Sequence, residues 1–167
     1  MDLPKRKHPR LKEYDYSQNG CYFITFCIKH REHLLNTINV GRDALIPQHT
    51  ALTSIGAIVN THIQNINSVY DNVLVDKYVI MPNHVHMLIS IISSPDGGGM
   101  RASRPTLHTI MRSLKTMVTR QIGYSVWQDS YHDHIIRNEQ EYQKIWEYID
   151  TNPLKWEADY YYSKSTK

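Results

Sequence analysis

Several features are scarce in this sequence of 167 residues, and each scarcity excludes a class of protein. There are two cysteines, Cys21 and Cys27, and both lie in one predicted strand. The strand between them spans roughly 20 Å, far beyond the ~7 Å limit for a disulfide, so we expect reduced thiols. No apolar run approaches the ~18 residues of a membrane span, and the basic N-terminus shows no secretory signal. We therefore expect a cytoplasmic protein without a membrane partner.

Acidic residues are absent from two stretches of a chain whose formal net charge is only +3. Residues 3–12 and 97–128 each contain five basic residues and no acid. Such stretches favour a localised anionic partner, with nucleic acid as the first candidate, although a solvated face is the alternative for either stretch alone. The side chains that we single out for DNA contact are Lys5, Arg6, Lys7, Arg10, Lys12, Arg101, Arg104, Arg112 and Lys115.

The spacing of apolar residues predicts an α+β fold in a single domain. Strands are expected at 22–28, 73–81, 84–92 and 129–137, and helices at 52–70, 105–122 and 138–151. This β-α-β-β-α-β order with an extra C-terminal helix is typical of a ferredoxin-like, RRM-like sheet of four antiparallel strands. In this interpretation residues 1–18 are a basic arm, 19–137 the ferredoxin-like core, and 138–167 the last helix and a tail.

The third predicted strand carries the most informative pattern, because two histidines open it at i and i+2. Side chains alternate across a strand, so His84 and His86 share one face while Val85 and Met87 share the other. We expect the apolar face to pack on the helices and the histidine face to be open, unless the last helix covers it. Two neighbouring imidazoles can hold a metal. Zinc is disfavoured, because it more often recruits cysteine or a carboxylate in a closed site.

The last predicted helix offers a nucleophile. Its apolar stripe consists of Tyr142, Ile145, Trp146 and Ile149. Tyr148 lies about 110° from the centre of that stripe, and Asn152 follows one turn later, so both can face one site. A phenol can attack a phosphodiester, and a divalent cation can polarise the phosphoryl oxygen. Tyr142 is the main rival as nucleophile, but it lies on the buried stripe.

Assembled in this way, the His-hydrophobic-His pair, the helical tyrosine and the predicted order resemble the HUH single-tyrosine transposases. The match is closest to the REP-associated tyrosine transposases within the IS200-like family. The segments that carry the resemblance are RLKEYDY at 10–16, YVIMPNHVHM at 78–87, VWQDSYHDHIIR at 126–137 and EYIDTNPLKW at 147–156.

The resemblance implies a set of roles. His84 and His86 would ligate Mg²⁺ or Mn²⁺, Tyr148 would be the nucleophile, and Asn152 would take the place of a further ligand. It implies an enzyme that cuts single-stranded DNA at hairpins with flanking single strands. Cleavage would form a 5′-phosphotyrosine bond and leave a 3′-hydroxyl that rejoins the strand. The sequence leaves open whether a second copy of the chain, in a homodimer, completes the site.

Three alternatives stay open at this stage. A histidine-triad phosphoesterase is disfavoured because its third histidine is replaced by Leu88. A binding module of the RRM type shares the predicted order, but it would carry aromatic residues where this chain has His84 and His86. A domesticated transposase could retain DNA binding without transposition, since an intact site indicates only the capacity to cut.

Two further groups have weaker assignments. His132 and His134 form a second His-x-His pattern, which we interpret as structural or as a support for the first pair. Lys155 and Trp156 follow the tyrosine helix and are candidates for contact with DNA. Three consecutive tyrosines at 160–162 have no assigned partner.

Overall fold

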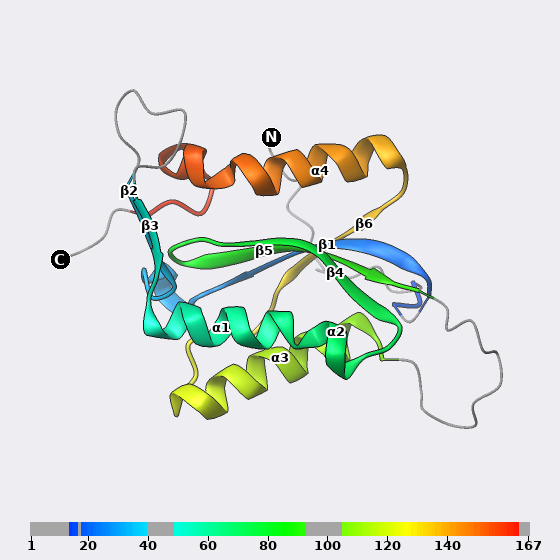
Figure 1. Ribbon diagram of the computed structural model, residues 1–167, viewed down its shortest axis with the longest axis horizontal. Helices are drawn as coiled ribbons and strands as arrows, with labels where there is room; N and C mark the ends of the chain where they lie inside the picture. Colours follow the sequence, from blue (N-terminus) through cyan, green and yellow to red (C-terminus); the bar gives the residue numbers. More distant parts are fainter. Residues whose placement is uncertain (1–13, 17, 40–48, 93–104, 164–167) are drawn as a thin grey trace.

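The computed structural model describes residues 14–16, 18–39, 49–92 and 105–163 (Figure 1). None of the helices in these ranges is long and apolar enough for a transmembrane span. The basic side chains at positions 5, 6, 7, 10, 12, 101 and 104 lie outside the described residues. The elements are β1 (Gly20–Cys27), η1 (Lys29–Arg31), β2 (Asn36–Asn39), β3 (His49–Leu52), α1 (Ser54–Gln64), α2 (Ile66–Val69), β4 (Val73–Ile80), β5 (His84–Ile91), α3 (Leu107–Ile122), β6 (His132–Ile136), α4 (Glu139–Thr151) and η2 (Asn152–Ala158).

The predicted α+β class and its antiparallel sheet of four strands are confirmed. The sheet has the order β4-β5-β1-β6, and each neighbouring pair is antiparallel. One detail differs from the sequence prediction. The helix expected at 52–70 is divided into α1 and α2 at Asn65, a residue of low helix propensity. A short hairpin, β2–β3, precedes α1, and the polar, irregular sequence of residues 29–49 leaves room for a hairpin there.

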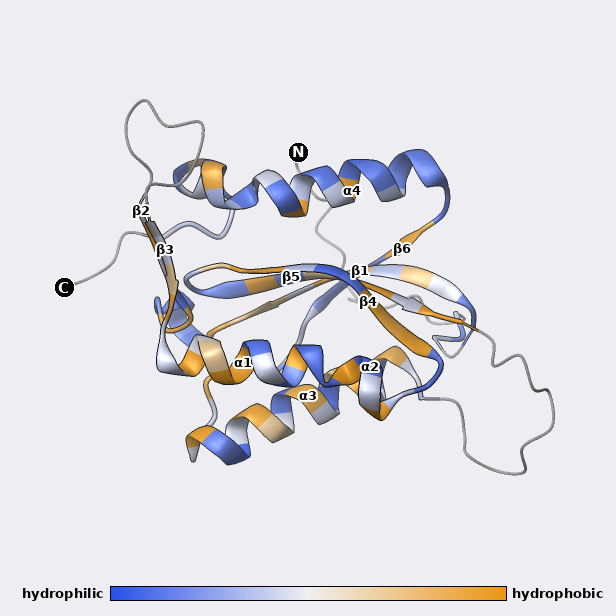
Figure 2. Ribbon diagram, in the orientation of Figure 1, coloured by the Kyte–Doolittle hydropathy of each residue, from blue (hydrophilic) through white to orange (hydrophobic). Residues whose placement is uncertain are grey.

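One face of the sheet forms the hydrophobic core. Tyr22, Ile24 and Phe26 of β1 are buried there, as are the alternating apolar residues of β5 that begin at Val85. Helices α1 and α3 cover this face, whereas α4 lies on the opposite side of the sheet (Figure 1). In Figure 2 the helices beneath the sheet carry many apolar residues, while α4 is largely hydrophilic. The alternation of β5 therefore places the histidines on the side of α4, as predicted.

Helix α4 is held against the sheet near both of its ends. At its start, Oε1 of Glu141 lies 2.6 Å from Nε2 of His134 on β6, and the Asn138 side chain caps the helix by accepting a hydrogen bond from the Glu141 amide at 2.8 Å. Near its end, Lys77 of β4 pairs with Asp150 at 2.7 Å, and its ammonium lies 4.5 Å from the Trp146 ring centroid. Only Ile149 of this helix is fully buried. The helix thus rests on the sheet through a narrow stripe and can present other side chains to the histidine face.

The two cysteines are free thiols, as the sequence predicted. Cys27 is buried and Cys21 is half-buried at the other end of β1. Burial raises the pKa of each thiol to about 11, so both are protonated and poorly nucleophilic at neutral pH.

A close backbone approach at Gly56 links the first helix to the corner that precedes the histidines. A Cβ added to Gly56 would overlap the carbonyl group of Leu35. That carbonyl accepts a hydrogen bond from the amide of Thr53, the helix cap, at 3.0 Å. The amide of Leu35 donates to the carbonyl oxygen of Pro82 at 3.0 Å, next to Asn83. Only glycine allows helix α1 to begin this close to the β4–β5 corner.

We expect Gly56→Ala to lower the free energy of unfolding by about 1–3 kcal/mol, because the new methyl group must push the Leu35 backbone away. Urea unfolding followed by circular dichroism measures this change. Ala57→Gly is the matched control, since Ala57 is exposed and its replacement costs only helix propensity, about 1 kcal/mol. A Gly56→Ala protein as stable as the wild type would contradict the close approach.

Candidate functional site

The two histidines of β5 meet through their Nε2 atoms. His84 and His86 are fully buried, and their Nε2 atoms lie 3.0 Å apart. Burial lowers the pKa of His84 to about 3, with a contribution from the charge of Arg31. Burial, followed by the neighbouring His84, likewise holds the pKa of His86 well below its usual value. Both imidazoles are therefore neutral at physiological pH and have lone pairs available for a cation.

Asn83 fixes which nitrogen of His84 carries the proton. The Asn83 Nδ2 group donates to the carbonyl oxygens of Arg31 and Tyr161, at 3.3 and 2.9 Å. This leaves the Asn83 Oδ1 atom, an acceptor, 2.8 Å from the Nδ1 atom of His84. Because amide oxygen only accepts, His84 must donate from Nδ1, and its Nε2 lone pair then points into the site.

Thr25 and Phe23, both on β1, position the second histidine. The Thr25 hydroxyl lies 2.7 Å from Nδ1 of His86, which leaves Nε2 of that ring turned toward His84. The Phe23 ring stacks on the His86 ring with centroids 5.3 Å apart and meets the Tyr148 ring edge-on at 6.0 Å. Neither contact was predicted, because both depend on the pairing of β1 with β5.

Helix α4 brings Tyr148 to this pair in the same chain. The Tyr148 hydroxyl lies 3.2 Å from Nε2 of His86 and 3.4 Å from Oδ2 of Asp159. The side chain is 39% exposed, so the ring also borders solvent. Partial burial and the Asp159 charge raise the pKa of the phenol. Tyr148 is therefore protonated at neutral pH, and its attack on any electrophile requires a proton acceptor.

Asp159 is the site residue that the sequence analysis missed. Its Oδ2 atom accepts a hydrogen bond from Asn152 Nδ2 at 2.8 Å, and its Oδ1 atom accepts one from the Tyr161 amide at 2.6 Å. Ligand atoms of His84, His86 and Asp159 all lie within 4.8 Å of one another. The sequence offers only a weak signal, because Glu157 and Asp159 both follow the Asn-Pro stop of the helix and no regular period distinguishes them.

The donor set suits a divalent cation. Two imidazole nitrogens 3.0 Å apart match the separation of adjacent ligands, each about 2.1 Å from one ion. Asp159 adds a carboxylate, and Asn152 is buried with an Oδ1 atom that has no hydrogen-bond partner among the described residues. An unpaired buried amide oxygen is an unfavourable arrangement that a cation could relieve. The oxygen donors suit magnesium or manganese, whereas two imidazoles and the carboxylate of Asp159 also suit zinc, so the structure removes the argument made against zinc from the sequence.

The C-terminal segment closes the site from the side. The ring of Tyr161 packs against those of His84 and His86, with centroids 4.7 and 5.8 Å away. Trp156 is buried, with its ring 6.0 Å from that of His84 and 5.5 Å from that of His33. The expectation that Trp156 could contact DNA is therefore wrong, because its indole packs inside the molecule. Lys155 beside it is exposed.

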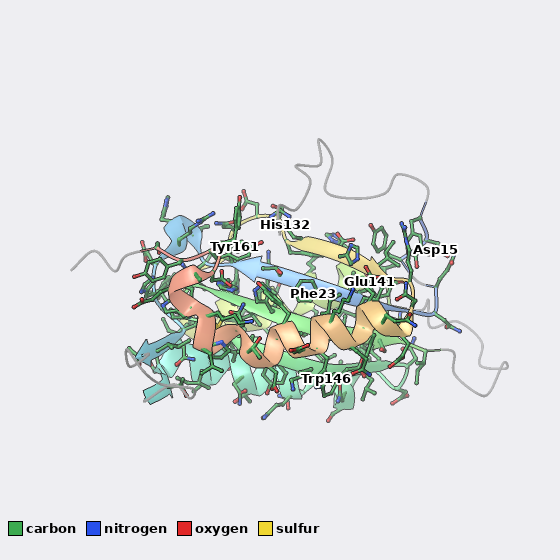
Figure 3. The ribbon with its side chains drawn as sticks, turned by 90° about the horizontal axis from the view of Figure 1, so that it is seen from above. Asp15, Phe23, His132, Glu141, Trp146 and Tyr161 are labelled. Carbon is green, nitrogen blue, oxygen red and sulfur yellow. The ribbon has the colours of Figure 1, made fainter. Side chains whose placement is uncertain are left out.

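The second histidine pair has two different environments. His134 is hydrogen-bonded to Glu141 of α4, with 2.6 Å between Nε2 and Oε1. That contact connects β6 to the start of the helix and supports a structural role. His132 is exposed. It lies opposite Thr25 of β1, and Thr25 in turn lies opposite His86 of β5. Seen from above, α4 runs along one side of this face, and His132 lies apart from it on β6 (Figure 3).

The described basic residues do not all gather at the site. Arg112 and Lys115 are on α3, across the sheet from the histidines (Figure 1). Arg112 is exposed, whereas Lys115 donates from Nζ to the carbonyl oxygens of Gln128 and Ser130, at 2.8 and 3.1 Å. Of the predicted DNA-contacting residues that the structure describes, only Lys155 follows the tyrosine helix directly.

Comparisons with known proteins were made by sequence and by fold. No family model matches the sequence. The chain is 37% identical to an uncharacterised protein of Haemophilus influenzae over 94% of this chain and 93% of that protein. It is 29% identical to the REP-associated tyrosine transposase of Escherichia coli over 48% of this chain and 44% of that protein.

A solved structure shares the fold. It is a REP-associated tyrosine transposase bound to a REP hairpin, with a TM-score of 0.62 and 20% identity. The alignment covers 87% of this chain and 73% of that chain. Together with the sequence similarity, it confirms the resemblance that the motifs indicated.

The buried histidines predict a pH-dependent stability in metal-free buffer. An unfolded histidine has a pKa of about 6.5, so below that pH the unfolded chain binds protons that folded His84 and His86 exclude. The free energy of unfolding should therefore fall as the pH decreases from about 6.5 toward 3, by roughly 1.4 kcal/mol per pH unit for each buried histidine. Urea unfolding in the presence of a chelator measures this slope.

His84→Gln should reduce the slope, because it removes one of the two excluded protons. His132→Gln is the matched control, since it removes an exposed histidine from the same face of the sheet. Equal slopes for the wild type and His84→Gln would contradict the neutral, buried state assigned to this ring.

Proposed function

Because this chain belongs to one family with the Haemophilus influenzae protein and resembles the REP-associated tyrosine transposases in sequence and fold, we propose that it is a metal-dependent DNA transposase. It nicks single-stranded DNA and rejoins it through a 5′-phosphotyrosine intermediate. The observation that carries this proposal is the 3.2 Å distance between the Tyr148 hydroxyl and Nε2 of His86. A phenol beside paired metal-ligating imidazoles is suited to phosphodiester chemistry.

Tyr148 is the nucleophile in this proposal. Its oxygen forms a bond to the scissile phosphorus, and the bond from phosphorus to the 3′ oxygen breaks. Asp159, whose Oδ2 atom accepts the phenolic hydrogen bond at 3.4 Å, is placed to receive the phenolic proton. The departing 3′ oxygen takes up a proton, from solvent or from the Asp159 carboxyl that received the phenolic proton, and becomes a hydroxyl. Rejoining reverses each of these transfers, so no external energy source is needed.

His84, His86 and Asp159 would hold Mg²⁺ or Mn²⁺, with the Asn152 amide oxygen as a further ligand. The bound ion would supply charge that polarises a phosphoryl oxygen. Asn83 and Thr25 would keep the two Nε2 lone pairs directed at the ion through the hydrogen bonds to Nδ1.

Hairpin DNA with single-stranded flanks is the proposed substrate, by analogy with the REP hairpin bound in the related structure. Lys155 and the two basic stretches would add salt-dependent affinity for phosphates with little sequence preference. Arg112 would reach DNA only if the strand passes around the sheet to the side of α3. A DNA-binding module without cleavage is the remaining alternative, and the following experiment separates the two.

Incubation with hairpin oligonucleotides and Mn²⁺ should yield a covalent protein–DNA adduct on denaturing gels. Tyr148→Phe should abolish the adduct, because the substituted ring has no oxygen to bond to phosphorus. Tyr142→Phe is the matched control on the same helix and should retain it. An adduct that persists in Tyr148→Phe would show that another residue is the nucleophile. Hairpin binding by the wild type without any adduct would favour the binding module.

Metal binding has its own test. We expect Mn²⁺ affinity, measured by calorimetry, to fall about 10-fold or more in His86→Gln and in Asp159→Asn, because each removes one ligand atom. Glu157→Gln is the matched control, because Glu157 is an exposed acid in η2, two residues before Asp159. Equal affinities for the wild type and Asp159→Asn would remove Asp159 from the ligand set.

A further inference from the structure

A cavity lined by both polar and apolar side chains lies at the free edge of the sheet, next to the site but separate from it. It has a volume of about 260 Å³ and is bounded by β4, α1, the β2–β3 hairpin and the first residues of η2. The side chains that matter for its chemistry are Asn36, Asn60, Tyr78, Val79 and Pro153. None of the described residues that line it carries a charge, so it is unsuited to a phosphate and suited to a neutral, polar group.

Asn36 supplies an acceptor that has no partner. Its side chain is 8% exposed, and its Nδ2 group donates to the carbonyl oxygen of Ile80 at 2.7 Å. Its Oδ1 atom is buried without a hydrogen bond to any described residue. Buried polar atoms in folded proteins are nearly always paired, so this oxygen requires an N–H or O–H donor from outside the described residues, which a bound water or a ligand can supply.

Tyr78 and Asn60 supply the complementary features. The Tyr78 hydroxyl donates to Oδ1 of Asn60 at 2.7 Å, which leaves the Asn60 Nδ2 group as a donor on the other side of the amide. The Tyr78 ring adds an aromatic surface, and Val79 an aliphatic one. An acceptor, a donor and an aromatic surface in one neutral cavity match an unpaired nucleobase, which is flat and has donors and acceptors along its edge.

The cavity lies one strand away from the site. Val79 of β4 is in register with His86 of β5, and neighbouring strands are about 4.8 Å apart. Pro153 directly follows Asn152, whose side chain is bonded to Asp159. Tyr78 is in register with Met87 and faces α1, so a base beside the scissile phosphate would reach Tyr78 and Asn60 around the free edge of β4.

We propose that this cavity binds an unpaired base adjacent to the scissile phosphate, with Asn36 and Asn60 hydrogen-bonded to the base edge and Tyr78 against the ring. This rests on the proposed function, because it requires a single strand at Tyr148. The base would anchor the strand and set which phosphodiester bond lies at the phenol.

The test uses a set of hairpin oligonucleotides in which one nucleotide at a time along the flanking strand is replaced by an abasic residue. Binding is measured by fluorescence anisotropy with Tyr148→Phe protein, so that cleavage does not interfere. One position near the cut should lose about 10-fold in affinity. Asn36→Leu or Asn60→Ala, added to the Tyr148→Phe protein, should weaken binding of the intact oligonucleotide by about the same factor. In each of these variants the abasic residue at that position should cause no further loss of affinity.

Asn60→Ala should leave the protein folded, because alanine is favoured in a helix such as α1. Asn65→Ala is the matched control, because Asn65 is an exposed asparagine outside the cavity. Penalties that persist in Asn36→Leu and Asn60→Ala, or a scan without a penalty, would overturn the cavity assignment. Adduct formation by the chain with native Tyr148 is measured on the same oligonucleotides. Adducts together with a flat scan would reject the cavity alone, whereas neither adduct nor binding would reject both proposals.

Discussion

The pairing of β5 between β1 and β4 is the constraint on which the rest of the structure depends. Its apolar residues must face α1 and α3, and a shift of one residue in either pairing would turn them to the other side. The same alternation fixes His84 and His86 on the face of α4. The hydrophobic core on one side of the strand thus determines the position of the polar site on the other. The histidines need no local flexibility to reach each other, since their Nε2 atoms meet across one strand repeat.

The site accumulates polar groups that the fold alone does not satisfy. Two imidazoles are buried as neutral rings, and the amide oxygens of Asn36 and Asn152 have no partner among the described residues. Groups of this kind cost stability. The histidines and Asn152 lie on the side of the sheet that carries Tyr148, and Asn36 lies at the edge next to it. The opposite face is filled mainly by aliphatic and aromatic residues, although it also contains the Nε1 atom of Trp127, which is unpaired within the described part of the chain.

Regular periods in the sequence predicted much of this arrangement, and irregular segments account for most of what was missed. The strand alternation at His84 and His86 and the position of Tyr148 off the apolar stripe allowed these groups to share a site, and the resemblance to the tyrosine transposases led to the prediction that they do. Asp159 could not be found this way, because it follows a 3-10 segment where no period relates it to Tyr148. Thr25 and Asn83 act through strand pairing and a corner, and such contacts depend on tertiary geometry. The break between α1 and α2 at Asn65 and the β2–β3 hairpin depend on weak local preferences. The spacing of apolar residues alone does not reveal them.

The attachment of α4 at both ends has a consequence for the fate of a cut strand. Asn138 and the contact of Glu141 with His134 hold the start of the helix, while Lys77 holds its last turn through Asp150. In the proposed reaction, DNA joined to Tyr148 would be carried on this helix, beside the histidine pair. The linked end would then remain at a high effective concentration for the 3′-hydroxyl that attacks it. Rigid anchoring of the helix would in this way favour resealing over loss of the DNA end to solvent.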